Sequence, residues 1–220
     1  MADSRPKSNM NDAEEYLTRY SRPPMTGPVA PELIAATEAV LDGHGWAGLT
    51  AELVAEAAGI NRVTLYRRGH TTAVLLAAAA SQAATEFERA ALTALTHPGS
   101  AIERIRTLLD ALYQLADDHL ALLAGLFDGP TAMFHLGGTA DDAPILTRLE
   151  YTEPFERLLR DGNHDGTLHS DKPRQDAELI FNTAGWTYIH LRRSHQWSAD
   201  RARAAVTRVA TAFIDPQLRE

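Results

Sequence analysis

The stretch from Thr50 to Leu76 constrains the fold of this chain more than any other part of its 220 residues. Its first half carries apolar residues at helical spacing, which are Leu53, Val54, Ala57 and Ala58. Gly59 then supplies the residue type that most readily takes the left-handed conformation with which helices end. Asn61 follows, and its side chain can cap a second helix by accepting a backbone hydrogen bond. The pattern therefore predicts two short helices joined by a tight turn.

The second of these helices has little to bury. Leu65 is its one apolar anchor, and Val63 lies roughly opposite it on a helical wheel. The arginines in or beside this helix are Arg62, Arg67 and Arg68. No acidic residue occurs between residues 57 and 85. An exposed, basic helix that is supported by a preceding one is suited to lie in the major groove of DNA.

Composition predicts a soluble, cytoplasmic protein. Because 45% of the residues are hydrophobic, the chain can bury the core of one large or two modest domains. Cysteine is absent, which excludes disulfides and cysteine-ligated metal. The longest apolar run, residues 73–80, is too short to span a bilayer, and the N-terminus lacks a signal-peptide pattern. The formal net charge of −8 opposes binding to nucleic acid in general, so any DNA contact must come from the basic segment.

Helical periodicity continues through most of the chain and predicts an all-α fold. Residues 1–28 are polar and interrupted by prolines, so we expect a disordered arm there. Further helices are predicted at residues 31–43, 72–95, from 101 to about 118, 120–127, 144–159, 176–194 and 199–214. Pro154 should bend or break the helix that contains it, and Trp46 should pack beneath the helix pair. We expect a DNA-binding domain in residues 29–76 and a larger helical domain in residues 77–220.

Residues 161–168 imitate the front half of a calcium-binding loop. The residues at its ligand positions are Asp161, Asn163 and Asp165. Lys172 stands where a bidentate glutamate is needed, so we expect no calcium. The chain has no histidine pair at metal-binding helical spacing, no nucleophile elbow and no phosphate loop. We therefore predict no metal, no cofactor and no enzymatic activity; an all-helical enzyme is a remote alternative.

The stretch from Leu33 to Leu76 resembles the DNA-binding domain of TetR-family transcriptional regulators. The matching motifs are Gly45-Trp46, Leu49-Thr50, Val54-Ala55, Ala58-Gly59-Ile60 and Thr64-Leu65-Tyr66. The resemblance implies an N-terminal three-helix helix-turn-helix domain followed by a larger C-terminal domain for ligand binding and dimerisation. It also implies a repressor that binds a palindromic double-stranded DNA operator as a homodimer and is released by a small-molecule effector.

The resemblance assigns DNA contacts by position. Arg62, Val63 and Thr64 fall where the family reads base edges, and Tyr66 falls where a hydroxyl meets a phosphate. The predicted DNA-binding residues are Thr50, Arg62, Val63, Thr64, Tyr66, Arg67, Arg68 and Thr72.

Three positions depart from the family pattern. They are Glu52, where a basic residue is frequent, Gly69, where a Phe is usual, and Thr72, where a Lys is usual. Losing the Lys removes a phosphate contact, and a Glu near the DNA backbone opposes another. We therefore expect weaker binding or an unusual operator. The alternative is a sensor of the same fold whose DNA binding is weakened or lost.

The C-terminal domain is predicted to supply a dimer interface and a ligand pocket. As the resemblance implies, the last two helices and their symmetry copies would form a four-helix interface. The predicted interface residues are Phe181, Ile189, Arg193, Val206, Val209 and Phe213. The candidate pocket residues are Leu109, Tyr113, Phe127, Met133, Phe134, Tyr151, Phe155 and Trp186. Because these are aromatic or apolar, the effector should be largely apolar; the alternatives are a monomer and plain core packing.

Overall fold

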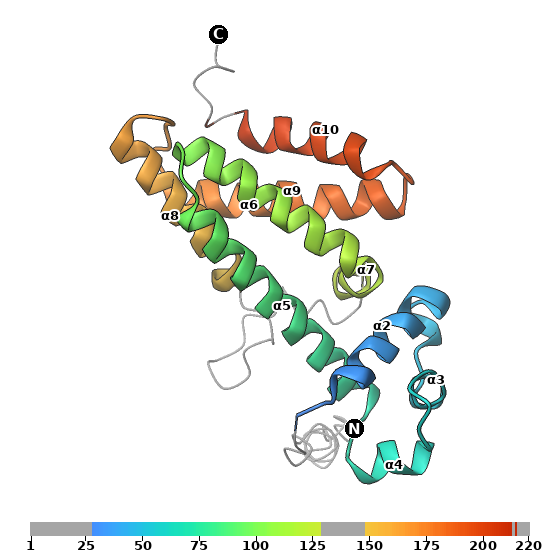
Figure 1. The fold of residues 1–220 in the computed structure, drawn as a ribbon. Helices are drawn as coiled ribbons and strands as arrows, with labels where there is room; N and C mark the ends of the chain where they lie inside the picture. Colours follow the sequence, from blue (N-terminus) through green and yellow to red (C-terminus); the bar gives the residue numbers. More distant parts are fainter. Residues whose placement is uncertain (1–27, 129–147, 213, 215–220) are drawn as a thin grey trace, which may run out of the picture.

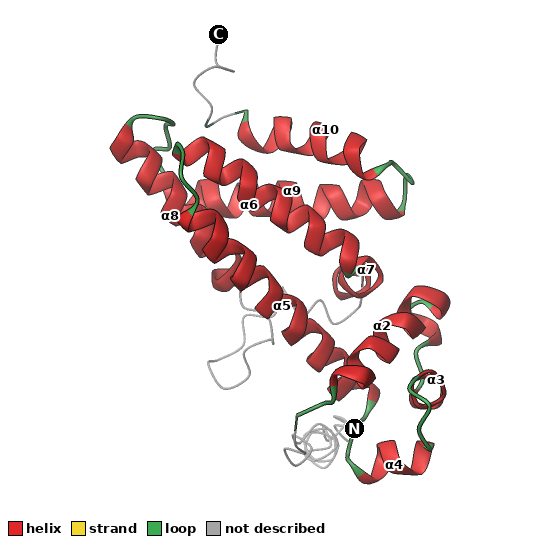
Figure 2. Ribbon diagram, in the orientation of Figure 1, coloured by secondary structure: helices red, strands yellow, loops and turns green. Residues whose placement is uncertain are grey.

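The computed structural model describes residues 28–128, 148–212 and 214, with the side chains of residues 126–128 and 148–150 left out. Within these ranges the chain forms helices and no strand (Figure 2). The elements are α2 (Pro31–His44), the 3-10 helix η1 (Trp46–Gly48), α3 (Ala51–Ala57), α4 (Arg62–Arg67), α5 (Thr72–Thr96), α6 (Ala101–Asp118), α7 (Leu120–Asp128), α8 (Arg148–Asp165), α9 (Pro173–Arg193) and α10 (Ala199–Thr211). The prediction of an all-α fold is confirmed. None of the helices described here combines the length and hydropathy that crossing a membrane requires.

Helices α2, α3 and α4 form an amino-terminal unit with the first turn of α5, and we term this unit the head (residues 29–76; Figure 1). Its buried core consists of Leu33, Ala36, Val40, Ala51, Val54, Leu65 and Leu75. Helices as short as α3 and α4 are marginal in isolation, because nucleating a helix is costly. Val54 of α3 and Leu65 of α4 are fully buried, so tertiary packing holds both helices in place.

The turn between α3 and α4 has the geometry that its residues predict. Thr50 caps α3 by accepting a hydrogen bond from the Leu53 N–H at 3.2 Å. Asn61 caps α4 by accepting one from the Val63 N–H at 2.8 Å. Between the two helices, Gly59 has a φ of 65°, in the left-handed region that favours glycine. These contacts fix the angle between α3 and α4.

The rest of α5 and helices α6 to α10 form a larger unit, which we term the body. Helix α5 runs from the head into the body, where it packs against α6 and α8, while α9 packs against α6, α8 and α10 (Figure 1). Tyr113 of α6 and Tyr188 of α9 are fully buried and stack with their ring centroids 4.6 Å apart. The expected domain boundary after residue 76 falls inside α5, so one continuous helix joins the head to the body.

Helix α8 differs from the prediction in two ways: it is not broken at Pro154, and it ends later than predicted. The helix neither ends at Pro154 nor at Leu159 but continues to Asp165. A proline in a helix interior costs about 3 kcal/mol. Four buried side chains outweigh this cost, at roughly 1.5–3 kcal/mol each, and they are Tyr151, Phe155, Leu158 and Leu159. The predicted start at Pro144 lies outside the described residues.

The segment that imitates a calcium loop has other roles. Most of it is the last turn of α8. The Asp161 carboxylate pairs with Arg104 at 3.1 Å, and Asn163 exchanges two hydrogen bonds with the backbone of Ser170. Asp165 accepts hydrogen bonds from the backbone and the hydroxyl of Thr167. These oxygens stabilise the turn into α9.

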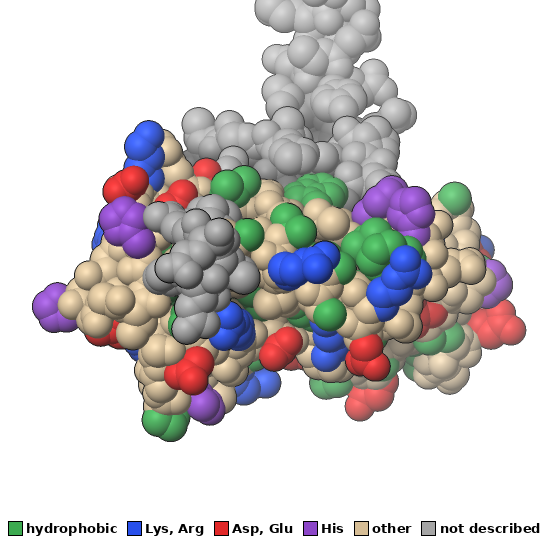
Figure 3. All heavy atoms as spheres, turned by 90° about the horizontal axis from the view of Figure 1, so that it is seen from above, with side chains coloured by type: hydrophobic (Ala, Val, Ile, Leu, Met, Phe, Trp, Pro, Cys, Tyr) green, Lys and Arg blue, Asp and Glu red, His purple; other side chains and the backbone are tan. Residues whose placement is uncertain are grey.

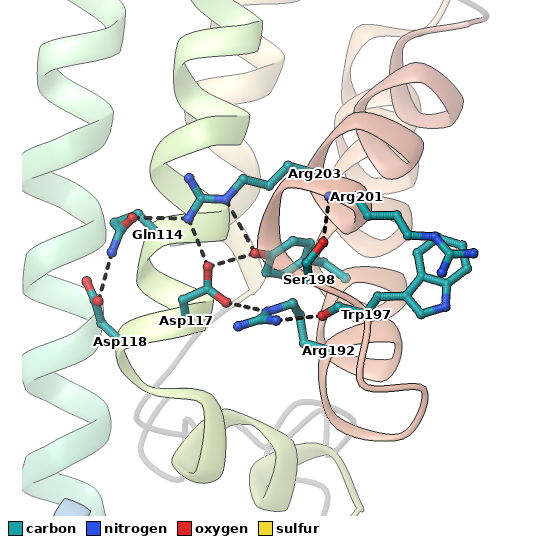
Figure 4. Close-up of polar contacts among 9 residues, drawn as sticks. Gln114, Asp117, Asp118, Arg192, Trp197, Ser198, Arg201 and Arg203 are labelled. Carbon is teal, nitrogen blue, oxygen red and sulfur yellow. Dashed lines mark hydrogen bonds and ion pairs between the residues drawn. The ribbon is translucent and has the colours of Figure 1, made fainter.

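A half-buried carboxylate joins three helices of the body (Figure 4). Asp117 of α6 accepts hydrogen bonds from the Tyr188 hydroxyl at 2.7 Å, from Arg192 Nε at 2.7 Å and from Arg203 Nη2 at 2.8 Å. Burial alone would raise the pKa of Asp117, but these hydrogen bonds lower it below the usual value. Because the donors belong to α9 and α10, the carboxylate ties both helices to α6.

The head meets the body at a histidine that lies between two carboxylates. His119, at the end of α6, is 6% exposed. Its Nδ1 lies 2.6 Å from Glu38 of α2, and its Nε2 lies 2.8 Å from Glu86 of α5. Burial alone would lower the pKa of His119, but the two carboxylates outweigh burial and raise this pKa to about 9. His119 is therefore charged at neutral pH and links the two units electrostatically.

Trp46 lies at the same junction, and not beneath the helix pair as predicted. Its indole Nε1 donates a hydrogen bond to the Ala121 carbonyl of α7 at 2.9 Å. A Cβ added to Gly125 would lie 1.8 Å from that nitrogen, so α7 accepts the indole only because residue 125 is a glycine. The aromatic ring therefore packs against the body core, which no local pattern could indicate.

Candidate nucleic-acid interface

Helix α4 shows most of its surface to solvent. The buried Leu65 anchors it, whereas Val63 and Tyr66 are 61% and 51% exposed. Both lie on a helix that has no core to cover on its outer side. Large apolar side chains exposed together with cations are typical of a surface that contacts another molecule. Figure 1 shows α4 at the edge of the head, away from the body.

Arg62 is the most constrained of the cations on this surface. It is the first residue of α4, and its Nη2 lies 2.7 Å from Glu52 Oε1 in the first turn of α3. The same nitrogen lies 3.4 Å from the Tyr66 hydroxyl, and the guanidinium carbon lies 5.0 Å from the centre of the Tyr66 ring. The hydrogen bond to Tyr66 and the charge of Glu52 raise the pKa of Arg62 above its usual value.

Arg67, the last residue of α4, and Arg68, which follows it, make the end of this helix basic. Both are exposed, and neither forms an ion pair or a side-chain hydrogen bond with any residue in the described part of the chain. Thr64 is half-buried, on the flank of the helix. The structure thus brings Arg62, Val63 and Tyr66 together with two free cations on one small surface.

The link from α4 to α5 explains one departure from the family pattern. Gly69 has a φ of 71°, a conformation that a phenylalanine would adopt only with strain. His70 follows, 4% exposed. Burial first, and then the charge of Arg68, lower its pKa, so the ring is neutral beside the cations.

The two threonines of the predicted set lie at helix starts. Thr50 is exposed, and its hydroxyl already caps α3. Thr72 is the half-buried first residue of α5, which Thr71 caps at 3.3 Å from the Val74 N–H. Short hydroxyls at these positions can reach a phosphate only if the backbone approaches it closely.

Seven of the eight predicted pocket residues separate into three groups. Leu109, Tyr113 and Phe155 are fully buried in the body core, and the Tyr113 hydroxyl accepts a hydrogen bond from Thr207. The half-buried Trp186 donates to Asn182 at 3.1 Å. Phe127, Met133 and Phe134 lie outside the residues whose side chains are described.

Tyr151, the eighth predicted pocket residue, lines a cavity in the described body. This cavity is apolar and has a volume of about 30 Å³. Its lining consists of Leu112, Leu115, Ala116, Leu123, Tyr151, Phe181, Gly185 and Ile189. Phe181 and Ile189, which are predicted dimer-interface residues, line this cavity. Helical periodicity gives the spacing of a face but not the neighbour it meets. A glycine in the middle of α9, Gly185, was the available sequence signal for space at this point.

The remaining predicted interface residues differ in how exposed they are. Val206 is 2% exposed and belongs to the core of its own chain, so it offers little surface to a partner. Val209 of α10 is 57% exposed, Arg193 is exposed, and Phe213 lies outside the described residues. Leu179 of α9, which is not among the predicted interface residues, is 52% exposed. Figure 3 looks onto the α10 side of the body, where hydrophobic side chains lie among basic and acidic ones.

Three helices packed around one small core, with an exposed basic second helix after the turn, define a helix-turn-helix domain. Residues 33–79 match the sequence profile of bacterial regulatory proteins, tetR family. The head therefore resembles the DNA-binding domain of the TetR family, and the chain has the fold of TetR-family transcriptional regulators. A search of curated proteins gives no match.

Solved structures of the same fold extend over most of the chain. A TetR/AcrR-family regulator from Thermobifida fusca is 21% identical with a TM-score of 0.64, covering 81% of this chain and 94% of its own. The fatty acid degradation regulator FadR from Bacillus halodurans is 16% identical with a TM-score of 0.65, covering 85% and 96%. SmeT, the repressor of the multidrug efflux pump SmeDEF of Stenotrophomonas maltophilia, is 17% identical with a TM-score of 0.64, covering 89% and 95%. At these identities the likeness concerns the fold.

Proposed function

We propose that this protein is a ligand-responsive repressor that binds a palindromic DNA operator as a homodimer and is released by a small, largely apolar molecule. The observation that carries the proposal is the outer surface of α4, where exposed Val63 and Tyr66 lie beside exposed arginines. A helix of this kind, held by a preceding helix, has the shape and charge to enter a major groove.

Each side chain has a contact that suits its chemistry. Arg62 can donate two hydrogen bonds to a guanine, and Val63 can pack against a thymine methyl group. The Thr64 hydroxyl can reach a base edge. Tyr66, Arg67 and Arg68 can bind phosphates, as can the hydroxyls of Thr50 and Thr72 with close backbone approach. Replacing Arg62 should therefore relax base preference, whereas replacing Arg68 should lower affinity for all sequences alike.

Dimerisation is proposed through the outer faces of α9 and α10. Leu179 and Val209 expose apolar surface there, and Arg193 lies at the end of α9. A two-fold axis through such an interface would pair these helices with their copies and place two α4 helices about one DNA turn apart. A palindromic operator follows from that symmetry.

Release by a ligand requires that the body change the position of the head. The apolar cavity of about 30 Å³ has room for about one water molecule, so a larger ligand must enlarge it. Its lining includes Leu123 of α7, and α7 also accepts the Trp46 hydrogen bond from the head. A ligand that shifts α7 would thereby favour another head position, and this differential affinity is what allostery needs. The names of FadR and SmeT, which concern fatty acids and a multidrug pump, favour an apolar ligand.

A second function is a sensor of this fold that does not bind DNA. Two observations favour it. Arg62, the main candidate for base recognition, is engaged in an ion pair with Glu52. Thr72 also stands where a lysine is usual in the family.

Enrichment of duplexes from a random library, followed by fluorescence titration at several salt concentrations, separates the two functions. A repressor should enrich a palindrome, and its affinity should fall steeply as salt rises. Failure to enrich any duplex, together with salt-independent background binding, would eliminate the repressor. Sedimentation of the free protein tests the dimer, because a monomer at micromolar concentration is incompatible with the operator geometry.

A further inference from the structure

The turn between α3 and α4 brings an acid and a base together on the outer surface of the head. Glu52 and Arg62 are ten positions apart, yet Glu52 Oε1 lies 2.7 Å from Arg62 Nη2. Both side chains remain about half exposed, at 47% and 56%. The pair therefore belongs to the surface that α4 would present to DNA.

The position of the guanidinium decides what Arg62 can do while the pair is closed. A guanidinium has two edges with paired N–H donors, one formed by Nε and Nη2 and the other by Nη1 and Nη2. Nη2 therefore takes part in every two-donor contact that Arg62 could make with a guanine. In the free protein this nitrogen lies within hydrogen-bonding distance of both Glu52 and Tyr66. Nη2 carries two N–H donors, one on each edge, and these are engaged by Glu52 and Tyr66. While both contacts persist, neither edge of the guanidinium is free for bidentate base recognition.

Glu52 also differs in charge from its surroundings. No acidic residue follows Glu56 until Glu86, and the Lys or Arg residues between them are Arg62, Arg67 and Arg68 in and beside α4. Glu52 reaches into this surface from α3 and neutralises the cation at the start of α4. Close to DNA phosphates the same carboxylate cannot gain a favourable contact, so Arg62 must leave it to bind.

We propose that Glu52 sets the affinity for DNA by acting through Arg62, which it holds in a closed ion pair that must open before base recognition. The inference rests on the proposed DNA-binding function and adds an autoinhibitory contact within the head. Exposed ion pairs change an equilibrium by about two- to five-fold, and this is the size of the effect that Glu52 should exert.

The test compares five proteins on one fluorescein-labelled duplex that the wild-type protein enriches from a random library. They are the wild type, Glu52→Gln, Arg62→Gln, the double variant and Glu56→Gln. Glu56 is a matched control, because it is an exposed carboxylate one turn further along α3 that does not pair with Arg62. Equal midpoints of urea unfolding establish that the variants retain the fold.

Glu52→Gln should bind the duplex about two- to five-fold more tightly than the wild type, and Glu56→Gln should show a smaller gain. The gain from Glu52→Gln should disappear in the Arg62→Gln background, because the residue it acts through is gone. Affinity of Glu52→Gln should also fall more steeply with salt, since salt weakens the closed pair in the wild type and offsets part of its loss.

Three results would overturn the inference while leaving DNA binding in place. A gain that persists without Arg62, or that Glu56→Gln reproduces in full, means that Glu52 acts only by its charge toward DNA. Weaker binding by Glu52→Gln means that the ion pair organises Arg62 for recognition. If neither the wild type nor Glu52→Gln enriches any duplex, the proposed function fails as well.

Discussion

The stability of this protein should fall as pH rises from about 6.5 to about 9, because of His119. The ring lies between Glu38 and Glu86, which raise its pKa to about 9 from an ordinary value of 6.5. A group whose pKa is raised by folding stabilises the folded state most below its unfolded pKa. That contribution is lost as pH rises through the folded pKa, so the window of change lies between the two values.

The magnitude follows from the size of the shift. Each pKa unit corresponds to 1.36 kcal/mol, so a rise to about 9 represents about 3 kcal/mol of stability. For a protein of this length, about 3 kcal/mol changes the melting temperature by roughly 6–12 °C. The effect should survive moderate salt, since the His119 side chain is only 5% exposed.

Thermal unfolding followed by circular dichroism between pH 6 and pH 10 measures the effect. His119→Gln is the comparison, because glutamine can donate a hydrogen bond but does not titrate. The difference in unfolding free energy between the wild type and His119→Gln should shrink as pH rises. Other groups that titrate in this range cancel in that difference. A difference that stays constant from pH 6 to pH 9.5 would refute the charged-histidine junction.

Three further substitutions, one of them with a matched control, test other contacts. Gly125→Ala should destabilise the fold by about 1–3 kcal/mol in urea unfolding, because the new methyl group collides with Trp46; an unchanged midpoint would contradict the packing. Asp117→Asn should cost about 1–3 kcal/mol, because it leaves two arginines without their carboxylate, while Asp118→Asn should stay within about 0.5 kcal/mol; equal effects would refute the three-helix tie. Val209→Glu should shift sedimentation from dimer to monomer with an unchanged circular dichroism spectrum, and a dimer that persists would move the interface elsewhere.

What the sequence predicted well depends on near neighbours along the chain. The cap at Asn61 and the left-handed Gly59 act within a few residues, and each is present in the fold. Most helix boundaries were predicted to within a few residues for the same reason, but the end of α8 was not. Of the two outcomes predicted at Pro154, a bend or a break, the break does not occur, because the local rule ignores four buried side chains around it. Trp46 was misplaced because its partner, Ala121, lies 75 positions away.

The same distinction explains why the candidate DNA surface was easier to predict than the pocket. The outer side chains of a recognition helix pack against no core. A short stretch of sequence is enough to indicate this, because it shows too few apolar residues for a second buried face. A pocket is defined by gaps between α6, α7, α8 and α9, whose side chains look alike in a core and in a cavity wall. Tyr151 lines the cavity whereas Phe155, one helical turn away, is fully enclosed. The candidate DNA surface of the head thus follows from residues that are close together in the sequence. A ligand pocket in the body depends instead on packing between distant segments. For that reason a ligand would be better sought through its effect on the junction at His119 and Trp46 than through any list of aromatic residues.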